Sequence, residues 1–201
     1  MGHLPLTILR RQSFIRDELT ASAETKKRII EECSDKIVKA VDVIIGALNN
    51  RKKILLCGNG GSAADCQHLA TEFVIRMSPA LKRPAIPAIA LTTDSSMLTA
   101  GANHLGYDHV FTRAIEALGV EGDVLLAITT SGKSASVNLA IQAAKKRGMK
   151  TIGFLGKDGG DALSLVDVPI LVPSSDTQRI QEGHIAIGHI ICALVEQEMY
   201  G

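Results

Sequence analysis

Four side chains of this sequence could act as metal ligands or could move protons. Two of them, His68 and Glu72, lie four residues apart in a segment whose apolar spacing predicts a helix, so they share one face. That spacing suits joint ligation of a metal ion or an acid–base pair beside one substrate. Most His–Glu pairs at this spacing are solvated surface contacts, but the glycine-rich loop just before this pair favours a functional interpretation.

The other two side chains, Gln181 and His189, lie on an apolar segment that predicts a last helix over residues 176–199. A lone histidine in such a helix is usually a hydrogen-bonded core residue, whereas a strip of buried polar side chains needs partners. The eight residues between Gln181 and His189 correspond to about 12 Å along a helix. One straight helix therefore brings both to a single ion only through long side chains or a second subunit.

A glycine-rich loop, Gly58-Asn59-Gly60-Gly61-Ser62, follows an apolar strand predicted at residues 54–57. Its glycines let the backbone approach a ligand closely. Ser62 is expected to cap the helix predicted at 63–77, whose first amides favour anionic or polar oxygens. The loop has neither the Walker nor the Rossmann glycine spacing, and a tight turn without a ligand is the alternative.

A second loop, Thr129-Thr130-Ser131-Gly132-Lys133-Ser134, lies between a strand predicted at 123–128 and a helix predicted at 134–147. Four hydroxyls, a glycine and a helix N-terminus are typical of a phosphate-binding loop. A simple helix cap would need only one of these hydroxyls. The loop therefore predicts a phosphate site.

The elements that must position these residues alternate between strand and helix. Further strands are predicted at 85–91, 151–155 and 168–172, and further helices at 94–102, 107–118 and 157–165. Near-continuous apolar strands between helices predict an α/β fold, a three-layer αβα sandwich with a five-stranded parallel sheet. Residues 13–50 predict a helical N-terminal extension, and the absence of a linker or repeat predicts a single domain over residues 1–201.

Composition limits the class of protein. The chain has 201 residues, 46 % of them hydrophobic, and a net charge of +1, so its charge suggests neither nucleic acid nor an acidic membrane as a partner. No apolar run reaches the roughly 18 residues of a membrane span, and Met1 to Arg11 lacks the apolar segment of a secretory signal. The four cysteines, which form no C-x-x-C pair, predict a reduced, cytoplasmic protein with buried thiols: Cys33, Cys57, Cys66 and Cys192.

Together these motifs resemble the phosphoheptose isomerase (sedoheptulose-7-phosphate isomerase) family of the SIS, or sugar isomerase, superfamily. The similarity extends from about residue 14 to 200. The loop Thr129 to Ser134, called here the hydroxyl loop, by itself marks only the superfamily. The joint presence of four residues points to the particular family: His68, Glu72, Gln181 and His189.

The resemblance implies that D-sedoheptulose 7-phosphate is converted through an enediol to D-glycero-D-manno-heptose 7-phosphate, a precursor of lipopolysaccharide heptose. It implies a homotetramer with active sites at subunit interfaces, in which N-terminal helices within residues 1–50 pack on the domain and on neighbouring subunits. It implies one zinc ion per subunit held by His68, Glu72, Gln181 and His189, with Glu72 and His189 as the acid–base pair.

The resemblance also assigns substrate contacts. They would come from Asn59, Gly60, Gly61, Ser62, Glu72, Asn103, His104, Thr129, Thr130, Ser131, Ser134 and Gln181. His104 departs from the family pattern, because it stands where relatives have an aspartate that contacts the substrate. This departure affects one hydroxyl contact and leaves the expected fold unchanged.

Two other functions stay open on the sequence alone. One is a tetrameric, non-catalytic SIS adaptor of the DNA-replication initiator-associating type, which has a similar Gly-Asn-Gly loop and need not keep Glu72 and His189. The other is an isomerase or sensor of a different sugar phosphate.

Overall fold

The computed structural model describes residues 7–201. Residues 1–6, part of the segment Met1 to Arg11 that lacks the features of a secretory signal, lie outside the described residues. Within the described residues, the N-terminal extension is a single 42-residue helix, α1 (Ile8–Asn49), in place of more than one N-terminal helix as expected. The hydroxyl of Thr7 accepts a hydrogen bond from the N–H of Arg10 and caps this helix.

The predicted five-stranded parallel sheet is confirmed for the described residues. It contains β1 (Ile54–Gly58), β2 (Ala88–Ala90), β3 (Val124–Thr129), β4 (Lys150–Leu155) and β5 (Val168–Leu171) in the order β2-β1-β3-β4-β5. Strand β2 is shorter than predicted. It begins just after Pro87, and a proline has no N–H to donate to a neighbouring strand.

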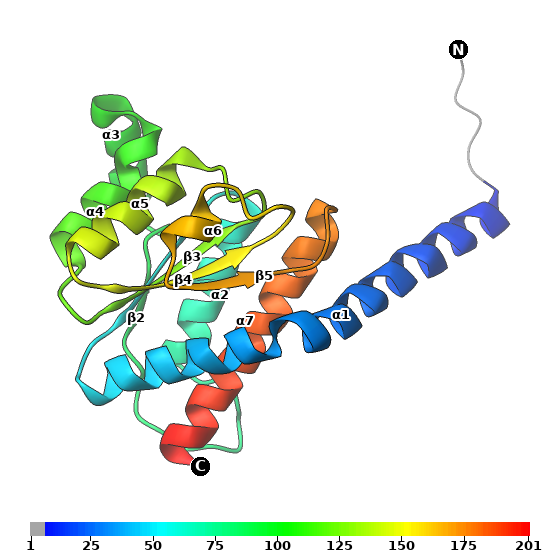
Figure 1. Cartoon of the computed structure of the whole chain (residues 1–201), viewed down its shortest axis with the longest axis horizontal. Helices are drawn as coiled ribbons and strands as arrows, with labels where there is room; N and C mark the ends of the chain where they lie inside the picture. Colours follow the sequence, from blue (N-terminus) through cyan, green and yellow to red (C-terminus); the bar gives the residue numbers. More distant parts are fainter. Residues whose placement is uncertain (1–6) are drawn as a thin grey trace.

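Helices cover both faces of the sheet and make the three-layer sandwich (Figure 1). Alternate residues of each strand point to opposite faces. Ile54 and Leu56 of β1 pack with α1, α2 (Gly61–Val74) and α7 (Thr177–Tyr200). Leu55 and Cys57 pack with α4 (Val110–Leu118), α5 (Ala135–Lys146) and α6 (Ala162–Leu165).

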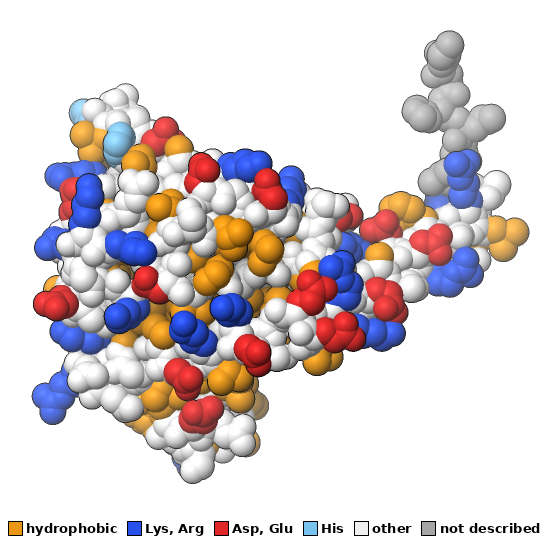
Figure 2. All heavy atoms as spheres, in the orientation of Figure 1, with side chains coloured by type: hydrophobic (Ala, Val, Ile, Leu, Met, Phe, Trp, Pro, Cys, Tyr) orange, Lys and Arg blue, Asp and Glu red, His pale blue; other side chains and the backbone are white. Residues whose placement is uncertain are grey.

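Two parts extend beyond this body. Helix α3 (Ser95–Leu105) and the short helix η1 (Tyr107–His109) protrude, and neither has a buried side chain (Figure 1). The first half of α1 projects on its own, and its first buried residue is Ser22. Figure 2 shows hydrophobic side chains among the charges of this projecting part, whose exposed members include Ile8, Leu9, Phe14, Ile15 and Leu19.

All four cysteines are free and buried, as predicted. Burial raises the pKa of the Cys57 thiol to about 12, so this thiol is un-ionised and unreactive at neutral pH. Within residues 7–201, none of the helices has the length and apolar character that crossing a bilayer requires.

Candidate active site

The hydroxyl loop and the glycine-rich loop meet beyond the carboxyl ends of the neighbouring strands β3 and β1, where a parallel sheet places its ligands. Together they enclose a cavity of about 200 Å³, called here the loop cavity. Its lining is neutral and mostly polar: Asn59, Ser62, Ile128, Thr129, Thr130, Ser131, Ser134 and Gln181. All of these except Ile128 are site residues predicted from the sequence, and they come from three separate segments of the chain.

Hydrogen bonds within the loop cavity fix much of its lining. The amide of Asn59 donates to the hydroxyls of Ser134 at 2.8 Å and Ser136 at 2.9 Å, and its oxygen accepts from the Tyr107 hydroxyl at 2.7 Å. Both amide hydrogens of Asn59 are therefore used within the protein. Asn59 is left with acceptor capacity only, so its predicted contact with a sugar would be as an acceptor of a substrate hydroxyl.

The hydroxyl loop packs against the loop that contains Gly159 and Gly160. Gly132 has a φ of +66°, and an added Cβ would lie 1.8 Å from the carbonyl oxygen of Gly159. Its carbonyl accepts from the Asn138 side chain and from the N–H of Ala162, both at 3.1 Å. Only glycine fits this position, so the backbone of the loop is preorganised.

The expected cap of α2 was wrong. Gly60, with a φ of +55°, is the N-cap residue, and α2 begins at Gly61. Ser62 lies inside the first turn, where its side chain is buried and lines the loop cavity. Its hydroxyl is therefore available to a ligand in that cavity.

Helices α2 and α7 run side by side in the same direction, and this arrangement places the remaining site residues. Contacts occur at Gly61 with Gln181, at Leu69 with Gly188, and at Met77 with Glu196. Paired residues differ by 119 to 121 positions, which shows a constant parallel register over the length of α2. Gly188 permits the approach, since an added Cβ would lie 2.5 Å from Cδ2 of Leu69.

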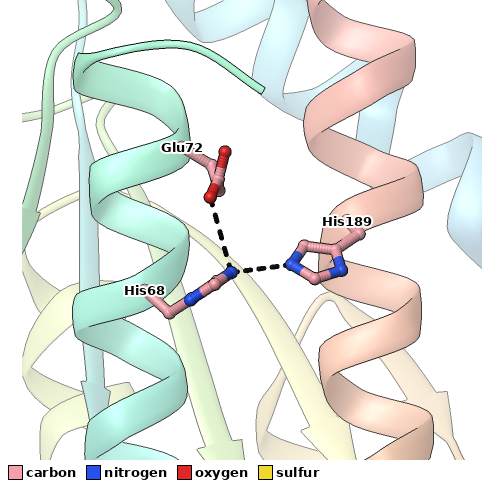
Figure 3. Close-up of side chains that lie close together, drawn as sticks. All are labelled: His68, Glu72 and His189. Carbon is pink, nitrogen blue, oxygen red and sulfur yellow. Dashed lines mark hydrogen bonds and ion pairs between the residues drawn. The ribbon is translucent and has the colours of Figure 1, made fainter. Parts of the chain in front are cut away.

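Where these helices touch, His68, Glu72 and His189 converge, and we call them the helix cluster (Figure 3). The Nε2 atoms of His68 and His189 lie 2.7 Å apart, and Nε2 of His68 lies 3.4 Å from Oε1 of Glu72. One ligand atom from each residue falls within 4.8 Å of the others. Two imidazoles and a carboxylate form a donor set that suits a metal ion such as zinc.

The structure brings together three of the four predicted metal ligands. Gln181 lies instead against Gly61, where an added Cβ would be 2.5 Å from its Nε2, and its side chain lines the loop cavity. His68 is seven residues further along α2, about 10 Å away along the helix. Within one chain, Gln181 and His189 therefore lie at different places along α7, as their spacing of eight residues indicated.

Two predicted substrate contacts lie apart from both parts of the site. Asn103 and His104 are exposed near the end of α3, and neither lines the loop cavity. Tyr107, which follows them, is the residue of this protruding region that reaches the cavity through Asn59. The sequence analysis missed this contact because a tyrosine in an ordinary helical pattern carries no sign of a distant partner.

Asp65 lies one turn before His68 on α2. Burial raises the pKa of its carboxyl, and the charge of the nearby His68 ring opposes that rise. Within residues 7–201, its Oδ2 atom is buried without a hydrogen-bond partner. An unsatisfied acceptor at this place adds to the polar groups near the start of α2.

Known proteins share both the sequence and the fold. The profile of the SIS domain family matches residues 19–156, and SIS domains are the class of protein that this sheet and this cavity define. A phosphoheptose isomerase from Clostridium acetobutylicum is 49 % identical over 192 residues, which cover 94 % of this chain and 97 % of that relative. The chain therefore belongs to the phosphoheptose isomerase family.

Two solved structures agree with this assignment. The phosphoheptose isomerase GmhA from Neisseria gonorrhoeae is 40 % identical with a TM-score of 0.87, and the match covers 92 % of this chain and 98 % of that one. A phosphoheptose isomerase from Francisella tularensis is 34 % identical with a TM-score of 0.89, covering 96 % of this chain and 100 % of that one. The similarity in fold thus extends over nearly the whole chain.

Proposed function

We propose that this isomerase interconverts D-sedoheptulose 7-phosphate and D-glycero-D-manno-heptose 7-phosphate, with the phosphate in the loop cavity and the reacting carbons at the helix cluster. The observation that supports this most directly is the spacing of the two parts along α2. Ser62 and His68 are six residues apart, or about 9 Å along the helix. The eight bonds from C1 to the phosphorus of an extended seven-carbon sugar span roughly 10 Å, taking the extension per bond of an extended backbone.

The loop cavity would bind the phosphate through hydroxyls and helix N-terminal amides rather than through buried cations. Thr130, Ser131 and Ser134 offer hydroxyls, and the first amides of α5 add the favourable end of its dipole. Binding energy obtained here, far from the reacting carbons, would hold C1 and C2 at the helix cluster.

Aldose–ketose isomerisation moves one proton between C1 and C2 and a second between the two oxygens. We assign the first transfer to Glu72, whose carboxylate takes the proton from C1 of the ketose and returns it to C2 of the enediol. We assign the second to His189, which passes a proton between the oxygens on C1 and C2. Atoms and charge balance, because each group ends in the state in which it began.

The helix cluster fits a bound zinc ion, with His68, Glu72 and His189 as ligands from this chain. Such an ion supplies Lewis-acid stabilisation of negative charge on the substrate oxygens. Gln181 is the fourth ligand that we propose. It joins the cluster only if its side chain reaches along α7 or if it comes from a neighbouring subunit.

A homotetramer with interface sites is part of the proposal. Its support is the projecting half of α1, where Ile8 and Leu9 are 73 % and 78 % exposed, because a folded chain rarely leaves such a series of apolar side chains in water. We also propose a cytoplasmic location and a role in supplying heptose for lipopolysaccharide or other surface glycans.

The deciding experiment is a coupled isomerase assay on ketose phosphates of five, six and seven carbons. We expect kcat/KM to be highest for the seven-carbon substrate, because only this chain length spans both parts of the site. Highest activity on a shorter ketose phosphate would support an isomerase of another sugar. Binding without turnover of any of them would support a sensor or a non-catalytic adaptor.

A further inference from the structure

Helix α2 ends two residues after Glu72, and a side chain of the loop that follows caps it. A helix leaves its last carbonyls without backbone partners, and water or a side chain normally satisfies them. The carbonyl of Glu72 is one of these, and it accepts a hydrogen bond of 2.8 Å from the guanidinium of Arg83. Arg83 lies in the loop between α2 and β2, so this loop folds back to cap the helix that carries Glu72.

Arg83 is itself held by an acidic residue of α7. Its Nε donates to Oε1 of Glu196 at 2.7 Å, and the side chains of the two residues are 0 % and 2 % exposed. The carboxylate of Glu196 also accepts from the backbone N–H groups of Met77 at 2.6 Å and Ser78 at 3.0 Å. Both carboxylate oxygens of Glu196 are therefore used, and the buried pair is fully engaged.

These contacts form a continuous connection between the two helices of the cluster. Glu196 lies seven residues after His189, two turns further along α7 and on the same side. The connection therefore runs from the carbonyl of Glu72 through Arg83 to Glu196 on α7, the helix that also carries His189. A planar guanidinium can bridge in this way because it donates in several fixed directions at once.

We propose that Arg83 and Glu196 are positioning residues of the active site: they fix the end of α2 against α7 and so set the separation of Glu72 and His68 from His189. This inference rests on the proposed function of the helix cluster. It assigns no proton transfer or metal contact to either residue. Groups that orient metal ligands in this way typically change metal affinity by about 10- to 100-fold.

The test must separate positioning from folding, because removing one partner of a buried ion pair leaves an unpaired charge and can unfold a protein. The double variant Arg83→Met/Glu196→Gln removes both charges and keeps an oxygen for the backbone N–H groups. We expect it to stay folded, to lose about 10- to 100-fold in Zn²⁺ affinity by chelator competition, and to lose kcat while KM changes less than about threefold. KM should hold because the loop cavity is untouched.

The matched control is Lys53→Met/Asp123→Asn. Lys53 and Asp123 form another ion pair, with Nζ and Oδ2 2.5 Å apart and Asp123 1 % exposed, and Asp123 likewise accepts from backbone N–H groups. This pair lies at the amino ends of β1 and β3, whereas the loops of the site lie at the carboxyl ends of these strands. We expect it to affect stability and to leave Zn²⁺ affinity unchanged.

A milder variant, Arg83→Lys, covers the case in which the double variant does not fold. It keeps the positive charge but loses the bridging geometry, so Zn²⁺ affinity should fall by about three- to tenfold. Wild-type Zn²⁺ affinity in either folded variant, or an equal loss in the control pair, would overturn the inference. Failure of the proposed function shows differently, as a wild-type protein that binds Zn²⁺ without isomerising the seven-carbon substrate.

Discussion

In the loop cavity, the polar groups are neutral hydroxyls and amides, and most of them are neighbours in sequence. Some are held by hydrogen bonds, such as those from the Asn59 amide to Ser134 and from the Gly132 N–H to Thr129. In the helix cluster, the groups are ionisable, they come from helices about 120 residues apart, and His68 is half exposed. Half of the lining of the loop cavity comes from one contiguous segment, Thr129 to Ser134, whereas the helix cluster exists only because α2 packs against α7. This difference agrees with the proposal that the loop cavity binds the phosphate of the substrate and that the helix cluster carries out the proton transfers.

The largest effect should come from Glu72→Gln. Glutamine keeps the shape of the side chain but cannot take a proton from carbon, so kcat should fall by about 10³-fold or more. The affinity for D-sedoheptulose 7-phosphate, measured by titration calorimetry, should stay within a few-fold because the loop cavity is unchanged. Glu116→Gln, at an exposed residue of α4 on the other face of the sheet, is the control. A Glu72→Gln enzyme of near-normal kcat would refute the assignment.

His184 lies on α7 between Gln181 of the loop cavity and His189 of the helix cluster, and it is fully buried. Its Nε2 lies 2.9 Å from the carbonyl oxygen of Leu155, and burial lowers its pKa from 6.5 to about 4, against the raising effect of that carbonyl. The unfolded chain therefore binds a proton at a pH where the folded protein does not. Stability is present above pH 6.5 and is lost as the pH falls towards 4, by up to about 3 kcal/mol.

Denaturant unfolding at pH 7 and pH 5, at one protein concentration, measures this effect. His184→Gln should be less stable at pH 7 because it alters a buried contact, and it should show a weaker dependence on pH. An equal dependence on pH in the variant and in the wild type would assign the acid sensitivity to other groups.

A moderate effect is expected from Thr130→Val in the loop cavity. Among the described residues, no hydrogen bond occupies the Thr130 hydroxyl, so it is available to a phosphate oxygen. Its loss should raise KM by about 10- to 100-fold, the range for hydrogen bonds to charged groups, with kcat nearly constant. Thr112→Val makes the same change at a buried hydroxyl of α4 and should leave KM unaltered. A fall in kcat instead of a rise in KM would contradict the proposal that the loop cavity binds the substrate and takes no part in the proton transfers.

The smallest effect should come from Gly188→Ala, which changes the spacing of the helices without changing any polar group. The new methyl would meet Leu69 and push α2 slightly away from α7, at a cost of about 1 kcal/mol in stability. Zn²⁺ affinity should fall a few-fold while KM is maintained. Gly46→Ala, in the interior of α1 where an added Cβ meets no described atom within 4 Å, is the control and should not weaken Zn²⁺ binding.

The sequence by itself determined the α/β sandwich and the hydroxyl loop. Strands such as 124–129 are apolar on both faces, which only a sheet covered on two sides explains, and Thr129 to Ser134 are contiguous, so their proximity needs no tertiary contact. It also indicated His68 and Glu72, because helical spacing places residues four apart on one face. The boundaries that it missed were at Gly60, Ser62 and Pro87, where backbone conformation outweighed side-chain pattern.

Only the tertiary structure decided which residues meet across α2 and α7. It brought His189 to His68 and placed Gln181 at Gly61, a choice that depends on the register of two parallel helices. That register comes from the close fit of Leu69 on Gly188 and from the Arg83–Glu196 pair, and Arg83 and Glu196 carry no motif in the sequence. Contacts between residues about 120 positions apart depend on how the whole core packs, and no local pattern encodes them.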